Sequence, residues 1–351
     1  MLGPMMTIKD VADKAGVSIA TVSRVLNGYK HVRPDVRARV QNVIAELDYR
    51  PNRLASSFRT QQSRIVGVLL RQQRTPFSSS LAYAIEEFLF DAGYQVLICS
   101  TNGDAAREEA YIRSMLELKA QGVIIRPSGS TARTGQNVAM LQKAGIPVVF
   151  ADMWYKVAGV SGVVCDNFSG GYQGIRYLLG LGHRHIGVIA GDGAQRQTRI
   201  DIGNVGSERV RGIIKASQDL ASDVALQFCS PFKAESNLET GRLEAGRLLR
   251  SHPELTALFC TTDMLAVGAM QAAQQLGIAV PGELSILGYD GVLESAITFP
   301  ALSTMRQPIH EMGTLAARTL HEHIENTDAP VQSVVLENSL VIRESTAAPR
   351  Y

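Results

Sequence analysis

The first fifty residues carry two short stretches in which apolar side chains recur at helical spacing. In residues 8–15 and again in residues 19–26, apolar positions three and four apart share one helix face. Thr7 and Ser18 stand where N-caps are expected, and Gly16 supplies a turn between the stretches. The pattern predicts a helix-turn-helix, whose second helix enters the DNA major groove. An ordinary helical hairpin packed against a core is the alternative that periodicity leaves open.

A third helix is expected from about Asp35 to Asp48, and the pattern changes from Arg64 onward. Short apolar runs rich in Val and Ile then alternate with stretches of helix length, which is typical of βαβ units and parallel sheets. The runs expected as strands are Ile65–Leu70, Gln95–Ser100, Gly122–Arg126, Pro147–Asp152, Gly162–Asp166, Ile186–Gly191, Val224–Cys229, Ala257–Thr262 and Leu284–Asp290. So many strands favour an α/β core of two doubly wound subdomains behind an all-α headpiece, with ligands at the carboxyl ends of the strands.

Length and charge fit this division. A chain of 351 residues is long enough for two or three compact units, and 45% hydrophobic residues suffice for a buried core. Residues 7–60 contain ten Lys and Arg against five Asp and Glu; by subtraction from 35 and 33, the remainder contains 25 against 28. A basic head on a slightly acidic body favours contact between the head and a polyanion. Chance unevenness on a solvated surface is the alternative.

The residues able to carry chemistry exclude several classes of protein. The cysteines are scattered through apolar runs, as buried thiols in a reducing compartment are. Metal-ligand spacing, a phosphate-binding loop and a nucleophile motif are all missing from the sequence, so no metal, cofactor or catalytic residue is expected. Neither a signal peptide nor a membrane span is recognisable, which favours a cytoplasmic location.

A longer series of motifs narrows the interpretation. The two-helix pattern continues through Pro34–Val40, Leu47–Asn52 and Arg53–Ala55, and this whole run resembles the lactose-repressor (LacI/GalR) family of bacterial transcription regulators. The rest resembles the periplasmic-binding-protein-like core of the same family. The segments that match it are Leu181–Ile186, Thr262–Gly268, Pro281–Asp290 and Leu302–Pro308. The resemblance therefore covers nearly the whole chain.

The resemblance implies which residues contact DNA. It places Ile19, Ala20 and Arg24 at the base-reading positions, and the Arg24 guanidinium can bind a guanine edge bidentately. Phe58 matches the side chain wedged between base pairs in the minor groove, where the family usually has Leu. A phosphate contact for Arg24 and core packing for Phe58 stay open as alternatives. The other DNA-binding positions implied are Thr7, Ser18, Thr21, Ser23, Asn27, His31, Asn52, Arg53 and Ala55.

The resemblance also implies the division of the chain. Residues 1–49 form the headpiece, residues 50–61 a hinge that orders on operator DNA, and residues 62–351 a core that binds an effector and dimerises. The chain is expected to cross between the two subdomains of the core near residues 166, 307 and 328. The expected N-subdomain comprises 62–165 and 307–327, and the expected C-subdomain 166–306 and 328–351.

Strand ends that match ligand-contacting positions of the family carry several charged residues. Three of them, Arg71, Arg126 and Arg209, are costly together unless negative charge meets them. Aspartates of the chain can supply that charge, or an anionic effector such as a sugar acid or a phosphorylated sugar can be held bidentately. Both interpretations stay open. The other effector-binding positions implied are Asp263 and Asp290, which can accept hydroxyl hydrogen bonds, together with Asp166, Phe77 and Phe232; each Phe can equally pack in the core.

These observations predict a DNA-binding transcriptional regulator, with repression favoured, whose operator affinity is set by a small sugar-like effector. A pseudo-palindromic operator needs two heads at fixed spacing, so a homodimer is expected, and the short segment after Ser345 favours a dimer over a tetramer. A solute-binding protein for sugar uptake and a sugar-processing enzyme are the alternatives. His183 and His185 do not favour the enzyme, because His-Arg-His before a strand is expected to cap the surface.

Overall fold

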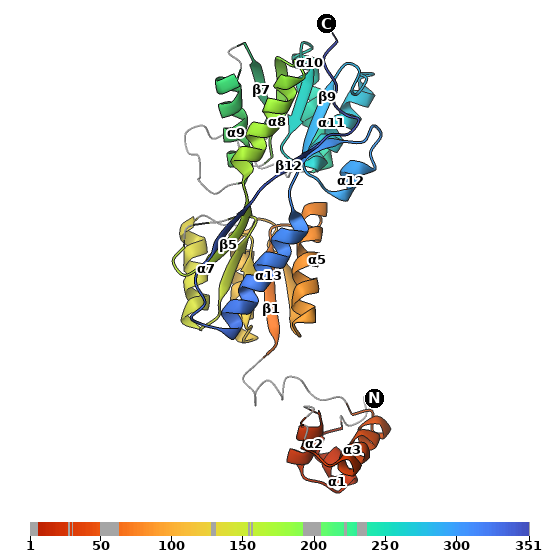
Figure 1. Cartoon of the computed structure of the whole chain (residues 1–351), viewed down its shortest axis with the longest axis vertical. Helices are drawn as coiled ribbons and strands as arrows, with labels where there is room; N and C mark the ends of the chain where they lie inside the picture. Colours follow the sequence, from red (N-terminus) through yellow and green to blue (C-terminus); the bar gives the residue numbers. More distant parts are fainter. Residues whose placement is uncertain are drawn as a thin grey trace. The chain divides into compact units, whose positions relative to one another are not determined.

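The chain divides into two compact units, Met1–Ser63 and Arg64–Tyr351 (Figure 1). The computed structural model describes residues 6–26, 29, 31–49, 63–127, 131–153, 155, 157–191, 205–220, 223–229 and 237–350. The whole of the expected hinge, residues 50–61, therefore lies outside the described residues. No helix in the described part of the chain is long and apolar enough to cross a membrane.

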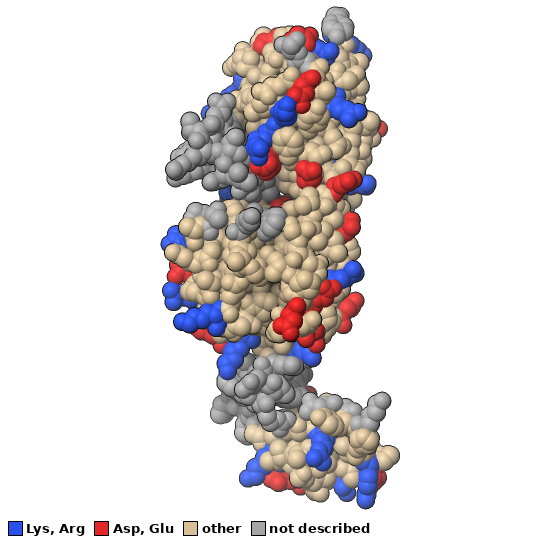
Figure 2. All heavy atoms as spheres, turned by 60° about the vertical axis from the view of Figure 1, so that its left-hand side comes forward, with Lys and Arg blue, Asp and Glu red and all other residues tan. Residues whose placement is uncertain are grey.

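The first unit contains the three predicted helices, α1 (Ile8–Ala15), α2 (Ile19–Leu26) and α3 (Pro34–Glu46). Their apolar faces meet in one core, in which Val11, Val22 and Val40 have no exposed surface. The third helix begins at Pro34 rather than Asp35, because proline fits the first helical position, where no N–H donor is needed. Figure 2 shows more basic than acidic surface on this unit.

The second unit contains two six-stranded sheets, and all strands of the first sheet are parallel. Its order is β11-β5-β4-β3-β1-β2. These strands are β1 (Ile65–Leu70), β2 (Gln95–Ser100), β3 (Gly122–Ile125), β4 (Val148–Ala151), β5 (Ser161–Cys165) and β11 (Ser333–Leu336). Helices α5 (Pro76–Asp91) and α13 (Ile309–Glu325) pack on one face, and α6 (Ala105–Glu117) and α7 (Thr131–Lys143) on the other.

The second sheet has the order β12-β10-β9-β8-β6-β7, and only its edge strand β12 is antiparallel to its neighbour. Its strands are β6 (His185–Ile189), β7 (Ala225–Cys229), β8 (Ala257–Cys260), β9 (Ser285–Asp290), β10 (Ser303–Arg306) and β12 (Ser339–Val341). Helices α8 (Asn167–Gly180) and α9 (Val205–Leu220) pack on one face, and α10 (Leu238–Ser251) and α11 (Asp263–Gln275) on the other. The short helix α12 (Leu293–Ala296) follows β9.

All nine predicted strands are confirmed, each within two residues of its expected ends. Strands β10, β11 and β12 were not predicted. Strand β10 has the sequence Ser-Thr-Met-Arg with one apolar residue, and β11 and β12 are short, partly exposed edge strands with two or three apolar residues each. The α/β class and the division into two doubly wound sheets are confirmed.

The chain crosses between the sheets three times, and the position expected for the third crossing is wrong. The first two crossings follow Cys165 and Arg306, as expected. The third lies between β11 and β12, at residues 337–338 rather than near 328. Ser333–Leu336 still pairs with Gly162–Cys165 in the first sheet, because Val334 and Leu336 pack against its core. The segment 328–336 therefore belongs to the first subdomain.

Two glycines bring α8 and α9 into close contact. A Cβ atom at Gly171 would overlap the carbonyl oxygen of Arg209, and one at Gly212 would overlap that of Phe168. Only residues without a side chain allow the two backbones to approach this closely. The crossing of α8 and α9 therefore fixes where the Arg209 side chain leaves its helix.

Candidate functional site

The first unit holds α1 and α2 in the predicted helix-turn-helix. The Thr7 hydroxyl accepts the Asp10 amide while the Asp10 carboxylate accepts the Thr7 amide, which forms a capping box. Gly16 has φ 63°, the left-handed conformation that ends α1. The Ser18 hydroxyl accepts the Thr21 amide at 3.2 Å and so begins α2. Both predicted caps and the predicted turn are confirmed.

The side chains of α2 divide between the core and solvent. Val22 and Val25 face the core, and this orientation leaves Ile19, Ala20 and Arg24 exposed. Ile19 is 43% exposed, so its side chain is accessible to a binding partner.

The remaining positions expected to contact DNA differ in exposure. Thr7, Ser18 and His31 are exposed and Thr21 is half-buried. Ser23 is only 8% exposed, so its side chain lies mainly in the helical core, contrary to the expectation of a surface contact. The other expected positions, Asn27, Asn52, Arg53, Ala55 and Phe58, lie outside the described residues.

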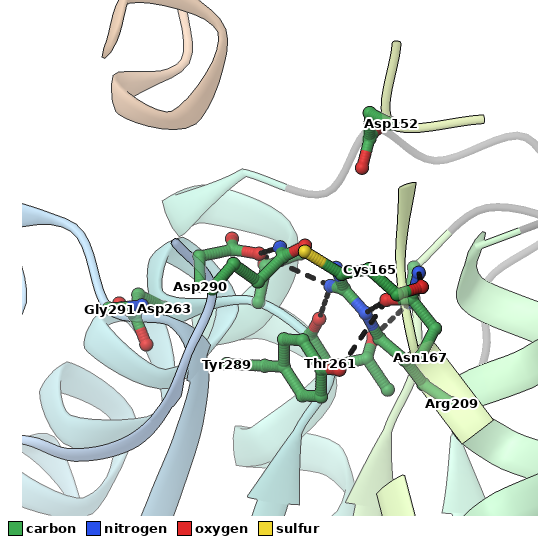
Figure 3. A network of polar contacts seen from close by, with 12 residues as sticks. Asp152, Cys165, Asn167, Arg209, Thr261, Asp263, Tyr289, Asp290 and Gly291 are labelled. Carbon is green, nitrogen blue, oxygen red and sulfur yellow. Dashed lines mark hydrogen bonds and ion pairs between the residues drawn. The ribbon is translucent and has the colours of Figure 1, made fainter. Parts of the chain in front are cut away.

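In the second unit, Arg209 of α9 lies at the centre of a buried polar network (Figure 3). Its Nε donates to Asn167 Oδ1 at 2.8 Å, and its Nη1 donates to the Thr261 carbonyl at 2.6 Å and to Asp290 Oδ1 at 3.2 Å. The guanidinium also stacks on the Tyr289 ring, 3.7 Å from its centroid. Arg209 is 3% exposed, so its guanidinium is enclosed by these protein groups.

Burial and charge determine the protonation of this network. Burial raises the pKa of Asp290 above its usual range, and the positive charge of Arg209 opposes the rise. Burial likewise raises the pKa of the Cys165 thiol to about 12, with the nearby Asp152 charge adding to the rise. Cys165 therefore stays a neutral thiol beside the ion pair, as the sequence predicts for a buried cysteine.

Asp263, at the start of α11, does not contact solvent. Its Oδ2 accepts the amides of Gly291 at 2.8 Å and Val292 at 2.9 Å, and its Oδ1 accepts the Thr304 hydroxyl at 2.6 Å. The side chain has 0% exposed surface. The expectation that Asp263 contacts an effector directly is corrected accordingly, because a fully buried carboxylate with three donors presents no oxygen to a ligand. Burial, followed by the charge of Asp290, raises its pKa.

At the first sheet, Arg126 follows β3 and pairs with Asp152, which follows β4. The Asp152 side chain is 1% exposed, and its Oδ1 has no hydrogen-bond partner among the described residues. Figure 3 shows Asp152 on the opposite side of the opening from Asp290 and Arg209, so the carboxyl ends of the two sheets face each other. Burial raises the pKa of Asp290, and the charge of Asp152 adds to this rise. Arg126 and Arg209 are thus both paired internally, which is one of the two alternatives that the sequence left open.

Of the remaining residues expected to bind an effector, three are described and one is not. Asp166 caps α8 by accepting the Ser169 amide at 2.9 Å and is half-buried. Arg71 follows β1, with its guanidinium against Gly103. Phe77 is partly buried and packs on the core between α5 and α13. Phe232 lies outside the described residues, as does most of the Gly-rich stretch before α9.

His183 corrects another expectation. It is 1% exposed rather than a surface cap. Its Nδ1 lies 2.9 Å from the Thr256 hydroxyl, and its Nε2 lies 2.9 Å from the Ala347 carbonyl. The neighbouring Arg184 does cap α8, because it donates to the Leu179 carbonyl at 3.1 Å. His183 therefore anchors the C-terminal segment on the second sheet.

Sequence reasoning missed Asn167, Gln307 and Thr304 as members of the network. Asn167 directly follows the expected Asp166, and Gln307 stands between Arg306 and Pro308 in a segment that matched the family. Asn167 and Gln307 lie just after strands β5 and β10, and Thr304 lies inside β10, in the segment Leu302–Pro308 that matched the family. Among the described residues no group of His, Cys, Asp or Glu could hold a metal ion.

Comparison with known proteins identifies the class of the chain. Residues 7–52 match the model of the bacterial regulatory proteins of the lacI family, and residues 175–346 match the periplasmic binding protein-like domain. The ribose operon repressor of Haemophilus influenzae is 31% identical over 97% of this chain and 98% of its own length. This chain belongs to the lacI family.

Solved structures agree with this identification. The lac repressor dimer bound to operator and the anti-inducer ONPF matches with a TM-score of 0.82 and 25% identity, covering 98% of this chain and all of that chain. A LacI-family regulator of Enterococcus faecium with bound ribose matches with a TM-score of 0.71 and 26% identity, covering 82% of this chain and all of that chain. The chain is therefore a DNA-binding transcriptional regulator of a repressor family, and the enzyme alternative is wrong.

Proposed function

We propose that this regulator reads its operator with Ile19, Ala20 and Arg24, and that a small neutral polyhydroxylated effector binds between its two sheets. We choose a neutral effector because Arg126 and Arg209 are paired with aspartates. This pairing favours a neutral effector over the sugar acids and sugar phosphates considered above.

The DNA-reading part of the proposal rests on exposure. Val22 and Val25 of α2 are buried in the core, and Ile19, Ala20 and Arg24 are exposed on the outward side of the helix. Arg24 can donate two parallel hydrogen bonds to guanine O6 and N7, whereas Ile19 and Ala20 can offer apolar contact to a thymine methyl.

We expect Arg24→Ala to relax specificity at one base pair of each half-site by about 1–3 kcal/mol, because a bidentate contact is lost. The measurement is binding of duplexes that differ at single positions, starting from the tightest duplex selected from a random pool. As the control we propose Lys9→Ala, on the exposed face of α1: a lysine that contacts only the phosphate backbone would, when removed, weaken all duplexes alike. An unchanged ranking of duplexes in Arg24→Ala would contradict the assignment.

Two buried hydrogen-bond acceptors favour an effector that carries several hydrogen-bond donors. Asp152 Oδ1 and Gln307 Oε1 have no hydrogen-bond partner among the described residues, and each residue is 2% exposed. An unpaired buried acceptor costs roughly 1–3 kcal/mol. Hydroxyl groups of a bound sugar would donate to such atoms, whereas an anionic carboxylate or phosphate group placed beside them would bring only further acceptors and add negative charge next to Asp152.

A thermal-shift series tests the effector class with D-ribose, ribose 5-phosphate and ribonate, alongside other neutral pentoses and hexoses. Ligand at 100 times its dissociation constant stabilises the folded state by about 2.7 kcal/mol, which a thermal shift detects readily. We expect a shift with a neutral sugar and none with its acid or phosphate. A shift with only the charged compounds would contradict the proposal.

We further propose that the regulator acts as a homodimer. Three apolar residues beside α12 are widely exposed: Leu293 at 77%, Ile297 at 75% and Phe299 at 97%. Phe299 also lines an apolar depression of about 290 Å³ with Val267 and Met270 of α11. A surface of this kind favours contact with another protein surface, and two-fold symmetry would match a pseudo-palindromic operator. Sedimentation at micromolar concentration tests this, and a monomer would contradict it.

Regulation then follows by linkage. An effector that binds one arrangement of the two sheets better than another shifts their equilibrium, and the affinity for operator shifts by the same free energy. The three crossings connect the sheets, and Asp166, Gln307 and Asn338 stand at them. Because its target is chromosomal DNA, we propose that the protein acts in the cytoplasm.

A further inference from the structure

The turn after β9 holds Asp290 in a conformation that non-glycine residues rarely adopt. Asp290 has φ 120°, and Gly291 follows with φ 74°. A Cβ atom at Gly291 would overlap the Arg306 side chain, so the second position requires glycine. Strained conformations of this kind persist only where surrounding contacts hold them, and they cluster at functional sites.

Asp263 supplies the contacts that hold the turn. Both backbone amides that follow Asp290, those of Gly291 and Val292, donate to one oxygen of Asp263 at 2.8 and 2.9 Å. The Thr304 hydroxyl on β10 donates to the other oxygen and so fixes the carboxylate between two elements. Figure 3 shows Asp263 next to Gly291, on the side of the turn away from Arg209.

Asp290 in turn connects the second sheet to a crossing. Its Oδ1 accepts Gln307 Nε2 at 2.8 Å, and its carbonyl accepts the Gln307 amide at 2.9 Å. Gln307 lies in the second crossing, between β10 and α13. In the described part of the chain, Asp263 forms no hydrogen bond with Gln307 or Arg209. An effect of Asp263 on Gln307 must therefore pass through the turn.

We propose that Asp263 is a positioning residue of the effector site: it sets the direction of the Asp290 carboxylate, and through it the position of Gln307 in the second crossing. The inference rests on the proposed effector site for its functional meaning. It assigns to Asp263 an indirect role in place of the direct effector contact expected from the sequence.

The chemistry of the side chain predicts which substitutions retain this role. Alanine removes every acceptor, so the Gly291 and Val292 amides lose their partner. Asparagine retains a carbonyl oxygen for both amides, and its NH₂ group can donate to the Thr304 hydroxyl, which is able to accept. Asp263→Asn is therefore expected to restore what Asp263→Ala loses, although it removes the charge.

Hydrogen–deuterium exchange read by mass spectrometry tests the proposal without any effector. In Asp263→Ala, peptides covering residues 289–293 and 305–309 should exchange about tenfold faster than in wild type, because a buried hydrogen-bonded turn is released. Asp263→Asn should exchange as wild type. Thr304→Val should accelerate the same peptides to a smaller extent, and it serves as the deciding variant if Asp263→Ala does not fold.

Thr262→Ala is the matched control, because it removes the N-cap of the same helix, where the Thr262 hydroxyl accepts the Leu265 amide at 3.3 Å. It should leave both peptides unchanged. Equal acceleration in Thr262→Ala would show a loose helix start instead of a positioned turn and would overturn the proposal. Acceleration confined to 289–293, without 305–309, would overturn it as well. Since no effector is needed, a wrong effector class would leave this result unaffected.

Discussion

The two sheets of the second unit have corresponding strand orders but different carboxyl edges. Counted from one edge, they follow β2-β1-β3-β4-β5-β11 and β7-β6-β8-β9-β10-β12. At the second sheet Arg209 donates to three acceptors and stacks on a ring. At the first, Arg126 pairs with Asp152, whose other oxygen has no partner among the described residues. Both edges retain an unsatisfied acceptor, since Gln307 Oε1 after β10 has no partner among the described residues either, but the arginine of the second edge is held by more protein groups than that of the first.

Helix packing explains part of the difference. The glycines of α8 and α9 let their backbones touch, so Arg209 leaves its helix at a fixed place. Hydrogen bonds formed before a ligand arrives need no ordering when it binds. We therefore expect the hydrogen bonds that a ligand forms with the first edge to contribute most to the closing of the two sheets.

The largest expected effect is that of Arg209→Met. It removes one donor each from Asn167, Asp290 and the Thr261 carbonyl and leaves the buried Asp290 without its positive partner. Breaking a buried ion pair in this way costs about 3–5 kcal/mol of unfolding free energy. Arg211→Met is the control on the same helix: its pair with Glu208 is partly exposed, so about 0.5 kcal/mol or less is expected. Urea unfolding measures both. Similar midpoints for the two variants would remove the distinction between the edges.

A glycine pair sharpens the packing argument. Gly171→Ala should destabilise the second sheet by about 1–3 kcal/mol, because the new methyl group meets the Arg209 backbone. Gly135→Ala in α7, beside the first sheet, meets nothing within 4 Å and should stabilise by roughly 0.5–1 kcal/mol. Thermal unfolding of the two variants should shift in opposite directions. Shifts of the same sign would contradict the close contact of α8 and α9.

A smaller effect is expected for Arg126→Met. The Arg126 side chain is 17% exposed, so water can replace part of its hydrogen bond to Asp152, and a loss of about 1–2 kcal/mol is expected. The measurement is the same urea unfolding. If Arg126→Met cost as much as Arg209→Met, the first edge would be as fully assembled as the second.

The smallest effect concerns pH. Burial lowers the pKa of His183, so the folded protein binds this proton less readily than the unfolded chain. The stabilisation that neutral, buried His183 provides is therefore fully present above the pKa of about 6.5 that histidine has in the unfolded chain, and it is lost as the pH falls below that value. The loss of unfolding free energy is at most about 1.4 kcal/mol per pH unit. His183→Gln should show less loss of unfolding free energy than wild type between pH 7.5 and 5.5. Parallel pH profiles would contradict the assignment.

Much of the fold was predictable because its helices and strands depend on residues that are close together in the sequence. The three helices of the first unit carry their own caps and apolar faces, and each of the nine predicted strands is a continuous apolar run. Strand β11 escaped prediction because its pairing partner lies about 170 residues earlier in the sequence, at β5. The expected third crossing was wrong for the same reason.

The candidate sites show the same limit. The exposure of Ile19, Ala20 and Arg24 follows from the helical spacing of the apolar residues around them, which is visible in the sequence. The pairing of Arg209 with Asp290 joins residues 81 positions apart, and that of Asp263 with Val292 joins residues 29 apart. No period in the sequence predicts which charges meet.

By itself the sequence determined the helix-turn-helix, the α/β core and the family, because these depend on patterns of burial and on ordered motifs along the chain. The tertiary structure decided which of those residues face a ligand. It paired Arg126 and Arg209 with aspartates, buried His183 and turned Asp263 away from solvent, because these outcomes depend on distances between residues that folding brings together. An aspartate near a strand end looks the same in the sequence whether it faces a ligand or supports a turn. Which of the two roles it has depends on the residues that surround it in the folded protein.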